Sequence, residues 1–346
     1  MRVTFLPTEN WRYAEHDVAG QTARTLARAS FPQALPGGSS VTTHLLVDER
    51  VWCHPDALVS LTAMAADHSN GVRVVDCGGQ TLVVCLQGDQ TAESVDQERT
   101  VAEVDSQERV IALDSTTALA ACERHVLLAR AMAAMAAGVR VRDPYAVYLR
   151  GMLIAEADVE IDIGTIIEGD VVLAAGVRVG PHCLLRDCRI GAGTVVNAYS
   201  IVDGADLGAG CRVGPYGRLR PGTTLGERVQ IGNFVEVKQS EIAEGCRINH
   251  HSFIGDATLG ARVTIGAGTI TCNHDGTGSQ PTVIGADVTV GSGCQLVAPV
   301  TITAGATVGA GSTITEHVTA PGLTLARAKQ VRIEGWTRPR SRRSPS

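Results

Sequence analysis

Hydrophobic residues recur at every sixth position through the second half of the chain, and a glycine often follows directly. A repeat of six residues cannot bury an apolar face by itself, so successive repeats must stack as the sides of solenoid coils. The glycine suits a tight turn between two sides. The pattern therefore predicts a parallel β-helix with an aliphatic core. The core positions are Ile161, Ile167, Leu173, Val179, Leu185, Val213, Leu219, Leu225, Ile231, Val237, Ile284, Val290, Leu296, Ile302, Val308 and Ile314.

The repeat is shortened in four places and broken in one. Between Thr271 and Ile284 the chain takes thirteen residues where six would suffice. A loop expelled from a rigid coil is a usual place for chemistry or for a partner contact. At four places two successive core positions are five residues apart instead of six. These steps predict corners that are one residue shorter, after which the next core positions still point inward. These steps are Leu185–Ile190, Val202–Leu207, Val237–Ile242 and Ile254–Leu259.

The chain before the repeat has a different pattern. Apolar runs at 43–47 and 81–85 predict strands, and 55–66 predicts a helix between them, so residues 1–112 are expected to form a small α/β domain. A helical connector is expected over 113–150, because an Asp114-Ser115-Thr116 cap precedes an amphipathic run that ends at Gly138. The solenoid then covers 151–320, and 321–346 is a C-terminal tail.

Composition and charge restrict the function. Aromatic residues are only 3 %, which fits a narrow core of stacked aliphatic side chains. The net charge of -6 argues against nucleic acid as the main partner, because a phosphate backbone requires a basic face. The basic run Arg338–Arg343 is better explained as a solvated end of the chain than as a nucleic-acid arm.

The cysteines indicate a reducing compartment. The chain has 10 of them, with no CxxC pair and no zinc-ligand spacing, so they are expected to be reduced apolar fillers. No signal-peptide pattern is found, and no uncharged apolar run is long enough to predict a membrane span. A cytoplasmic protein without a membrane partner is therefore expected.

Several strings in the solenoid resemble one bacterial family. It is the bifunctional glucosamine-1-phosphate N-acetyltransferase/N-acetylglucosamine-1-phosphate uridylyltransferase, and the similarity is to its acetyltransferase half. The resemblance covers about two thirds of the chain. It implies a left-handed parallel β-helix, a homotrimer with active sites between subunits, and acetyl-CoA as acetyl donor, with no metal needed for acetyl transfer. The strings are Arg218–Gly222, Gly232–Lys238, Gly266–Asn273, Gln295–Val300 and Glu334–Trp336.

The nucleotidyltransferase half of that family is poorly represented. It would open with a strand and a Gly-rich loop whose backbone N–H groups approach the nucleotide phosphates. The run Met1–Asn10 contains no such loop, although Leu45–Pro55 resembles a reduced form of the family's metal-binding strand. The first domain is therefore expected to be degenerate and to have lost nucleotidyl transfer.

Acetyl transfer to an amine requires a base for the amine proton and donors for the oxyanion of the tetrahedral intermediate. His250 matches the family's catalytic histidine, and an imidazole titrates in the range that this chemistry needs. His251 is its rival. Asn273, in the expelled loop, matches a residue that reaches the reacting centre of a neighbouring subunit, and the backbone N–H of Ser292 is the expected oxyanion donor.

The resemblance also assigns the binding residues. Arg220 and Lys238 match positions that hold the acceptor's phosphate, for which a guanidinium and an ammonium are suitable groups. Glu236 could order the base or the amine. For acetyl-CoA, the implied contacts are small residues, backbone N–H groups and one arginine. These positions are Ala267, Ser292, Ala310 and Arg327.

Four pocket positions depart from the family. Phe253 and Thr264 stand where it has a tyrosine and an asparagine, and His274 and Ser279 stand where it has a tyrosine and a lysine. Because stranded polar groups cost about 1–3 kcal/mol each, such a pocket should select a different ligand. We therefore expect acetyl transfer to an altered amino sugar phosphate or a related small amine, in specialised metabolism.

Two other functions stay open. A bifunctional enzyme would retain nucleotide binding in its first domain, although the missing Gly-rich loop argues against it. A non-catalytic solenoid scaffold would also be compatible with the four departures. Binding of acetyl-CoA and of uridine nucleotides distinguishes the three hypotheses.

Overall fold

The computed structural model describes the backbone of the short strands between Arg2 and Ala112 and, in full, residues 115–337. It divides into two compact units, Met1–Gly193 and Thr194–Ser346. The predicted domain boundaries therefore stay a prediction. The expected helix at 55–66 and the basic run at 338–343 lie outside the described residues.

The first part of the chain contains a four-stranded sheet in the order β1-β4-β7-β6. β1 is parallel to β4, whereas β7 is antiparallel to both β4 and β6. The strands predicted at 43–47 and 81–85 correspond to β4 and β7. Two further pairs, β2 with β3 and β5 with β8, are antiparallel. The bounds are β1 Arg2–Leu6, β2 Asp17–Val18, β3 Gln21–Thr22, β4 Thr43–Asp48, β5 Val51–Cys53, β6 Val72–Val75, β7 Thr81–Gln87 and β8 Val110–Ala112.

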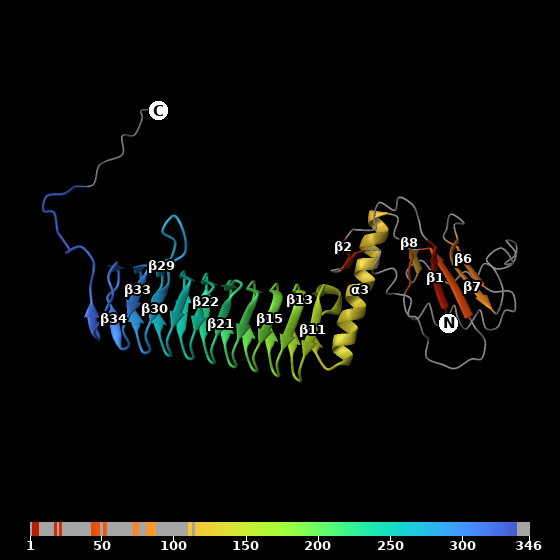
Figure 1. Cartoon of the computed structure of the whole chain (residues 1–346), viewed down its shortest axis with the longest axis horizontal. Helices are drawn as coiled ribbons and strands as arrows, with labels where there is room; N and C mark the ends of the chain where they lie inside the picture. The colour runs from red at the N-terminus through yellow and green to blue at the C-terminus, as the bar shows by residue number, and fades with distance from the viewer. Residues whose placement is uncertain are drawn as a thin grey trace, which may run out of the picture. The chain divides into compact units, whose positions relative to one another are not determined.

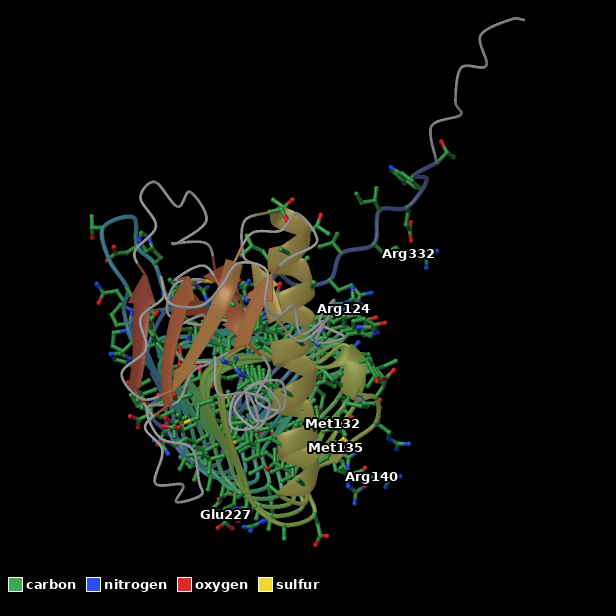
Figure 2. The ribbon with its side chains drawn as sticks, turned by 90° about the vertical axis from the view of Figure 1, so that its right-hand side faces the viewer. Arg124, Met132, Met135, Arg140, Glu227 and Arg332 are labelled. Carbon is green, nitrogen blue, oxygen red and sulfur yellow. The ribbon has the colours of Figure 1, made fainter. Side chains whose placement is uncertain are left out.

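The predicted connector helix is α3, Thr116–Ala136. The Ser115 hydroxyl caps it by accepting a hydrogen bond from the Ala118 N–H at 3.1 Å. Its inner face buries Leu119, Cys122, Val126, Leu127 and Ala131, while Met132 and Met135 lie on the exposed side (Figure 2).

The helix packs against the first coil. It contacts β10 and the 3₁₀ turn η2, and the Arg130 side chain donates to the Leu149 carbonyl at 2.9 Å. β9 and β10, inside the range expected for the connector, already pair with solenoid strands. The first unit ends with β9 Arg140–Val141, η2 Pro144–Ala146, β10 Tyr148–Leu149, β11 Met152–Ala155, β12 Glu160–Ile161, β13 Ile166–Leu173, β14 Arg178–Val179 and β15 Leu184–Ile190.

The second unit consists of parallel coils whose strands follow one another along two sheets (Figure 1). Strands of the sheet that carries the expected acceptor residues are β17 Ile201–Asp203, β18 Ala205–Leu207, β20 Arg218–Leu219, β21 Thr223–Leu225, β23 Glu236–Lys238, β24 Glu241–Ile242, β26 Phe253–Gly255, β27 Ala257–Leu259, β29 Ile270–Cys272, β30 Thr282–Ile284, β32 Gln295–Val297, β33 Val300–Ile302 and β35 Thr313–Ile314. The other sheet has β16 Val195–Val196, β19 Arg212–Val213, β22 Gln230–Asn233, β25 Arg247–His250, β28 Thr264–Ile265, β31 Thr289–Val290, β34 Ala306–Val308 and β36 Gly322–Thr324.

The predicted fold class is confirmed: the chain is mainly β, with a left-handed parallel β-helix of hexapeptide repeats. Every aliphatic position of the predicted repeat is buried, none with more than 3 % of its surface exposed. The core is therefore the one that the six-residue period predicts.

The shortened corners have a common backbone solution. Each step of five residues contains one residue with a positive φ, namely Asp187 at 45°, Gly204 at 55°, Gln239 at 44° and Asp256 at 49°. The corners of six residues also contain such a residue, for example Gly222 at 77° and Asp287 at 60°. A left-handed residue is therefore common to both corner lengths, and the five-residue corners keep the phase of the core with one residue less.

The buried thiols behave as apolar fillers, as the sequence predicts. All cysteines with described side chains are free, and all but the half-buried Cys272 are buried. Burial, with a smaller contribution from Glu123, raises the pKa of the Cys122 thiol to about 12. Burial likewise raises the pKa of Cys211 and Cys246. These thiols stay protonated and unreactive at neutral pH.

The coils approach each other too closely for a side chain at Gly260. A Cβ there would come within 2.5 Å of the Ala286 nitrogen and 2.9 Å of the Gly285 carbonyl carbon. Gly260→Ala is expected to destabilise the second unit by about 1–3 kcal/mol, because backbone must move to make room. Thermal unfolding should show a Tm several degrees lower. Gly278→Ala is the control, since a Cβ at Gly278 meets nothing within 4 Å; equal Tm values for the two variants would contradict this packing.

Candidate active site

His250 lies at a corner of the coil with its side chain exposed. It ends β25 and pairs in register with Asn233 of β22. Its Nδ1 is 2.6 Å from Asn233 Oδ1. The His250 carbonyl accepts a hydrogen bond from the Gly268 N–H at 3.2 Å, which fixes the corner from the next coil. Among the residues that the structure describes, no hydrogen bond or ion pair is seen at the other ring nitrogen, Nε2, which is the free position of this imidazole.

The residues expected to line the acetyl-CoA groove occupy the same corner in the following coils. The Ala267 carbonyl accepts from the N–H of the next coil's glycine at 2.7 Å, and the Ser292 carbonyl does the same at 2.8 Å. Arg327 Nη1 donates to the Ala310 carbonyl at 2.8 Å. The backbone bonds therefore align His250, Ala267, Ser292 and Ala310 in one column at the corners of successive coils, and the Arg327 side chain contacts the last of them.

A second column, one residue further along the chain, explains the role of His251. Its ring is the last of four stacked rings and lies 5.0 Å from that of Phe234. Tyr216 and Tyr199 continue the stack at 5.1 Å and 5.2 Å. From the next coil onward this column holds Gly268, Gly293 and Gly311. The column of rings thus stops at His251, and small residues follow it in the next coils.

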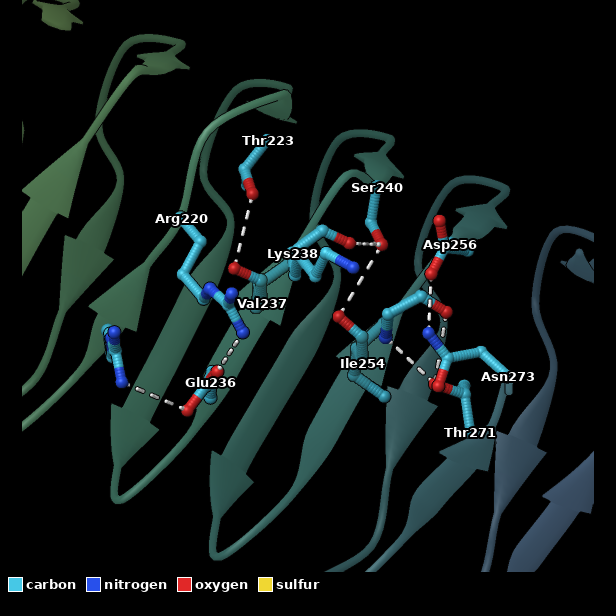
Figure 3. A network of polar contacts seen from close by, with 12 residues as sticks. Arg220, Thr223, Glu236, Val237, Lys238, Ser240, Ile254, Asp256, Thr271 and Asn273 are labelled. Atoms are coloured by element: carbon cyan, nitrogen blue, oxygen red, sulfur yellow. Dashed lines mark hydrogen bonds and ion pairs between the residues drawn. The ribbon is translucent and has the colours of Figure 1, made fainter. Parts of the chain in front are cut away.

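The expected phosphate-binding pair lies on the outward face of the adjoining sheet. Arg220 and Lys238 are neighbours across β20 and β23, since the Arg220 N–H donates to the Val237 carbonyl at 2.9 Å. Glu236 does not contact His250 but accepts a hydrogen bond from Arg220 Nη1 at 2.8 Å and lies 3.7 Å from Arg218 (Figure 3). Its carboxylate orients the Arg220 guanidinium.

Buried hydroxyls hold this face in place from within (Figure 3). Thr223 Oγ1 donates to the Val237 carbonyl at 3.2 Å, and Ser240 Oγ accepts from the Ala257 N–H of the next coil at 3.1 Å. One coil further along, Thr271 Oγ1 accepts a hydrogen bond from the Gly255 N–H at 2.8 Å. The three residues are at most 2 % exposed. Each therefore joins neighbouring coils at the strands that carry the candidate acceptor residues.

Phe253 and Asn273 meet above Gly255. A Cβ on Gly255 would lie 2.7 Å from the Phe253 ring and 2.9 Å from Asn273 Nδ2. Asn273 Nδ2 also donates to an oxygen of Asp256 (Figure 3). Within one chain, Asn273 is thus tied to the coil that also carries His250 and Phe253.

Thr264 is not brought to this cluster. It lies on β28 of the other sheet, paired with Arg247 and Thr289, whereas Phe253 lies on β26. The single chain therefore unites most of the expected acceptor residues but leaves Thr264 on a different face of the coil.

The expelled loop has its own internal structure. His274 and Ser279 form an antiparallel bridge, and the Asp275 carboxylate accepts bonds from Thr277, Gly278 and Gln280. These hydrogen bonds lower the pKa of Asp275 well below its ordinary value, with those from Thr277 contributing most. The loop is therefore a preformed projection.

Two polar residues of the site escape the sequence reasoning. Asn233 lies inside one of the strings that carry the resemblance and Asp256 lies six residues after His250, yet neither is singled out. A coil-length comparison would have found Asn233, since it precedes His250 by 17 residues. Asp256 carries no such signal, because its partner Asn273 lies at the start of an irregular loop.

The described residues contain no cluster of three or more His, Cys, Asp or Glu side chains placed to hold a metal ion. No helix in the described part of the chain is long and apolar enough to cross a membrane.

Comparisons with known proteins place the chain in a class. Residues 281–316 match the bacterial transferase hexapeptide model of six repeats, and residues 149–232 match the GMPPB C-terminal domain model. The chain therefore contains hexapeptide repeats similar to those of bacterial transferases.

The particular similarity is to the bifunctional protein GlmU. That of Methylibium petroleiphilum is 52 % identical over 225 residues, which are 65 % of this chain and 49 % of the relative. That of Nitrosospira multiformis is 49 % identical over 227 residues, 66 % of this chain and 49 % of the relative. The predicted resemblance is confirmed, and the chain spans about half the length of the curated relatives it matches. A solved Arabidopsis UDP-N-acetylglucosamine acyltransferase shares 14 % identity over 48 % of this chain and 67 % of its own, with a TM-score of 0.21, too low to support an argument.

The loop analysis yields a prediction about Asp275. A carboxylate with a lowered pKa contributes order above the unfolded pKa of about 3.9 and loses it as the pH falls further toward the folded value. The loop should therefore stay ordered from neutral pH to about pH 4. Asp275→Asn should loosen it already at pH 7, seen as faster amide exchange at Thr277 and Gly278. Asp206→Asn, at an exposed carboxylate on β18, is the control. Unchanged exchange in the Asp275 variant would show that other contacts hold the loop.

Proposed function

We propose that this chain is an acetyl-CoA-dependent N-acetyltransferase that acts on an amino sugar phosphate or a related small amine. The observation that carries the proposal is the identity to GlmU proteins of about half of the aligned residues, which cover about two thirds of this chain. It is supported by the column that aligns His250 with the small residues of the groove.

His250 is the proposed base. Its exposed imidazole is held through Nδ1, so Nε2 can accept a proton from an acceptor ammonium or from the amine as it attacks the thioester carbon. The free thiol leaves as coenzyme A once the tetrahedral intermediate collapses. The backbone N–H of Ser292 is the proposed donor to the oxyanion of that intermediate, because it lies in the same column.

Arg220 and Lys238 form the proposed phosphate site. Two adjacent cations on neighbouring strands repel each other, and an anion between them relieves that repulsion. Glu236 leaves part of the positive charge uncompensated, since one carboxylate faces both Arg218 and Arg220. A monoanionic or dianionic group on a small acceptor fits this face.

The acceptor is proposed to differ from glucosamine-1-phosphate. Phe253, next to Gly255, lacks the hydroxyl of the family's tyrosine. Thr264, on the other sheet, has a shorter polar side chain than the family's asparagine. In the loop, the His274–Ser279 bridge replaces a tyrosine and a lysine. A pocket with fewer hydrogen-bonding groups favours a less polar amine phosphate of specialised metabolism.

A homotrimer is part of the proposal. The loop bridged at His274–Ser279 projects from the coil, and in a trimer it could reach the corner of a neighbouring subunit. Acetyl transfer in the cytoplasm, where acetyl-CoA is available, is the proposed setting. A mass of three chains by light scattering supports this assembly, and a monomer contradicts it.

The adjacent histidines allow a matched test of the base. His250→Ala should lower kcat by about 10²-fold or more, since general-base catalysis contributes about 10²–10⁴. Acetyl-CoA should still raise the Tm of this variant. His251→Phe preserves the ring stack and should keep turnover.

The assay measures thiol release from acetyl-CoA over a panel of amines that includes glucosamine-1-phosphate. Full turnover by His250→Ala would place the base elsewhere. If the wild-type protein turns over no amine, a Tm shift with uridine nucleotides would favour the bifunctional hypothesis. No shift with either ligand would favour a scaffold.

The phosphate site gives a separate prediction. Lys238→Met removes one charge-assisted contact worth about 1.5–3 kcal/mol, so KM for a phosphorylated acceptor should rise by about 10- to 100-fold. The internal control is the same amine without its phosphate, for which wild type and variant should have equal kcat/KM. A similar loss with both acceptors would indicate a general disturbance of the coil.

A further inference from the structure

Asn233 is the one side chain whose hydrogen bond to the His250 ring the structure describes. The two residues are directly opposite in the parallel pair β22–β25, and Oδ1 to Nδ1 measures 2.6 Å. The Asn233 carbonyl also accepts the N–H of His251 at 3.1 Å. Backbone and side chain of Asn233 therefore both fix the corner that carries the imidazole.

A neutral imidazole carries one proton, on either of two nitrogens. An amide oxygen can only accept, so contact with Asn233 Oδ1 requires the proton on Nδ1. Nε2 is then left with its lone pair in the exposed part of the ring. The geometry thus selects the tautomer that can take up a proton at Nε2, and it limits rotation of an otherwise exposed ring.

The carboxylate expected to assist the base does not do so in this chain. Glu236 is occupied by Arg220 at 2.8 Å and lies on the other sheet. The orienting group is therefore neutral. A neutral acceptor fixes the tautomer without placing a negative charge beside the ring.

We propose that Asn233 is the positioning residue of the candidate base: it holds His250 in the Nδ1–H tautomer and directs Nε2 to the acceptor amine. This inference rests on the proposed acetyltransferase function. It concerns one further residue of that reaction and predicts a state of the imidazole that can be observed without turnover.

The experiment compares Asn233→Leu, which has no acceptor, with Asn233→Asp, which keeps an oxygen at the same place. Steady-state kinetics use acetyl-CoA and the amine of the panel that the wild-type protein acetylates fastest. Asn233→Leu should lower kcat by about 10- to 100-fold, the usual effect of removing a group that orients a histidine ligand or base. KM for both substrates should change less than about threefold. Asn233→Asp should recover most of the lost kcat.

Asn249→Leu is the matched control. Asn249 precedes His250 on the same strand, and its side chain makes no hydrogen bond among the described residues. This variant should retain wild-type kcat, so a loss specific to Asn233 on β22 cannot be a general effect of replacing an amide beside His250.

The second readout is the ring-nitrogen spectrum of ¹⁵N-histidine-labelled protein, with the His250 signals assigned by their loss in His250→Ala. Wild type should show Nδ1 protonated and Nε2 unprotonated at alkaline pH. Asn233→Leu should shift His250 toward the Nε2–H form, whereas Asn249→Leu should not.

The outcomes are separable. Nε2–H in wild type, or an unchanged tautomer in Asn233→Leu, overturns the inference, because the amide would then donate or be irrelevant. Unchanged kcat in Asn233→Leu also overturns it. If wild type acetylates no amine but shows the Nδ1–H tautomer that Asn233→Leu loses, the proposed function fails while the positioning by Asn233 stands.

Discussion

The hydrogen-bond register between parallel coils is the constraint on which the rest of this molecule depends. Each coil pairs with the next over only a few residues per side, and it does so with the aliphatic positions aligned in the interior. A slip by one residue would turn the core outward. Once the register is fixed, every outward residue acquires fixed neighbours in the coils on both sides.

The candidate site is a direct product of this register. His250 meets Asn233 because one coil separates them, and the small residues of the groove follow His250 for the same reason. Buried Thr223, Ser240 and Thr271 support the arrangement by satisfying backbone groups between coils. These buried hydroxyls therefore help to position the residues on the outer face, because they fix the spacing of the strands that carry Arg220 and Lys238.

Sequence alone could predict the features that repeat. The period of six identified the buried aliphatics, the steps of five identified corners that contain one left-handed residue, and the break at 271–284 identified the loop. Side-chain contacts were harder to predict. Glu236 was expected to order the base or the amine, but its carboxylate binds Arg220, and the contact of Asp256 with Asn273 depends on how an irregular loop leaves its strand. Such contacts depend on rotamers and loop geometry, which the hydrophobic pattern does not encode.

The column from His250 to Ala310 also acts as a molecular ruler. It advances by three strand spacings of about 4.8 Å, or about 14 Å in total, and the stacked rings that end at His251 mark its origin. The length of this column of residues is thus set by the number of coils. Insertions or deletions could change it only by whole coils, whereas substitutions can change the chemistry at each position without altering the spacing between positions.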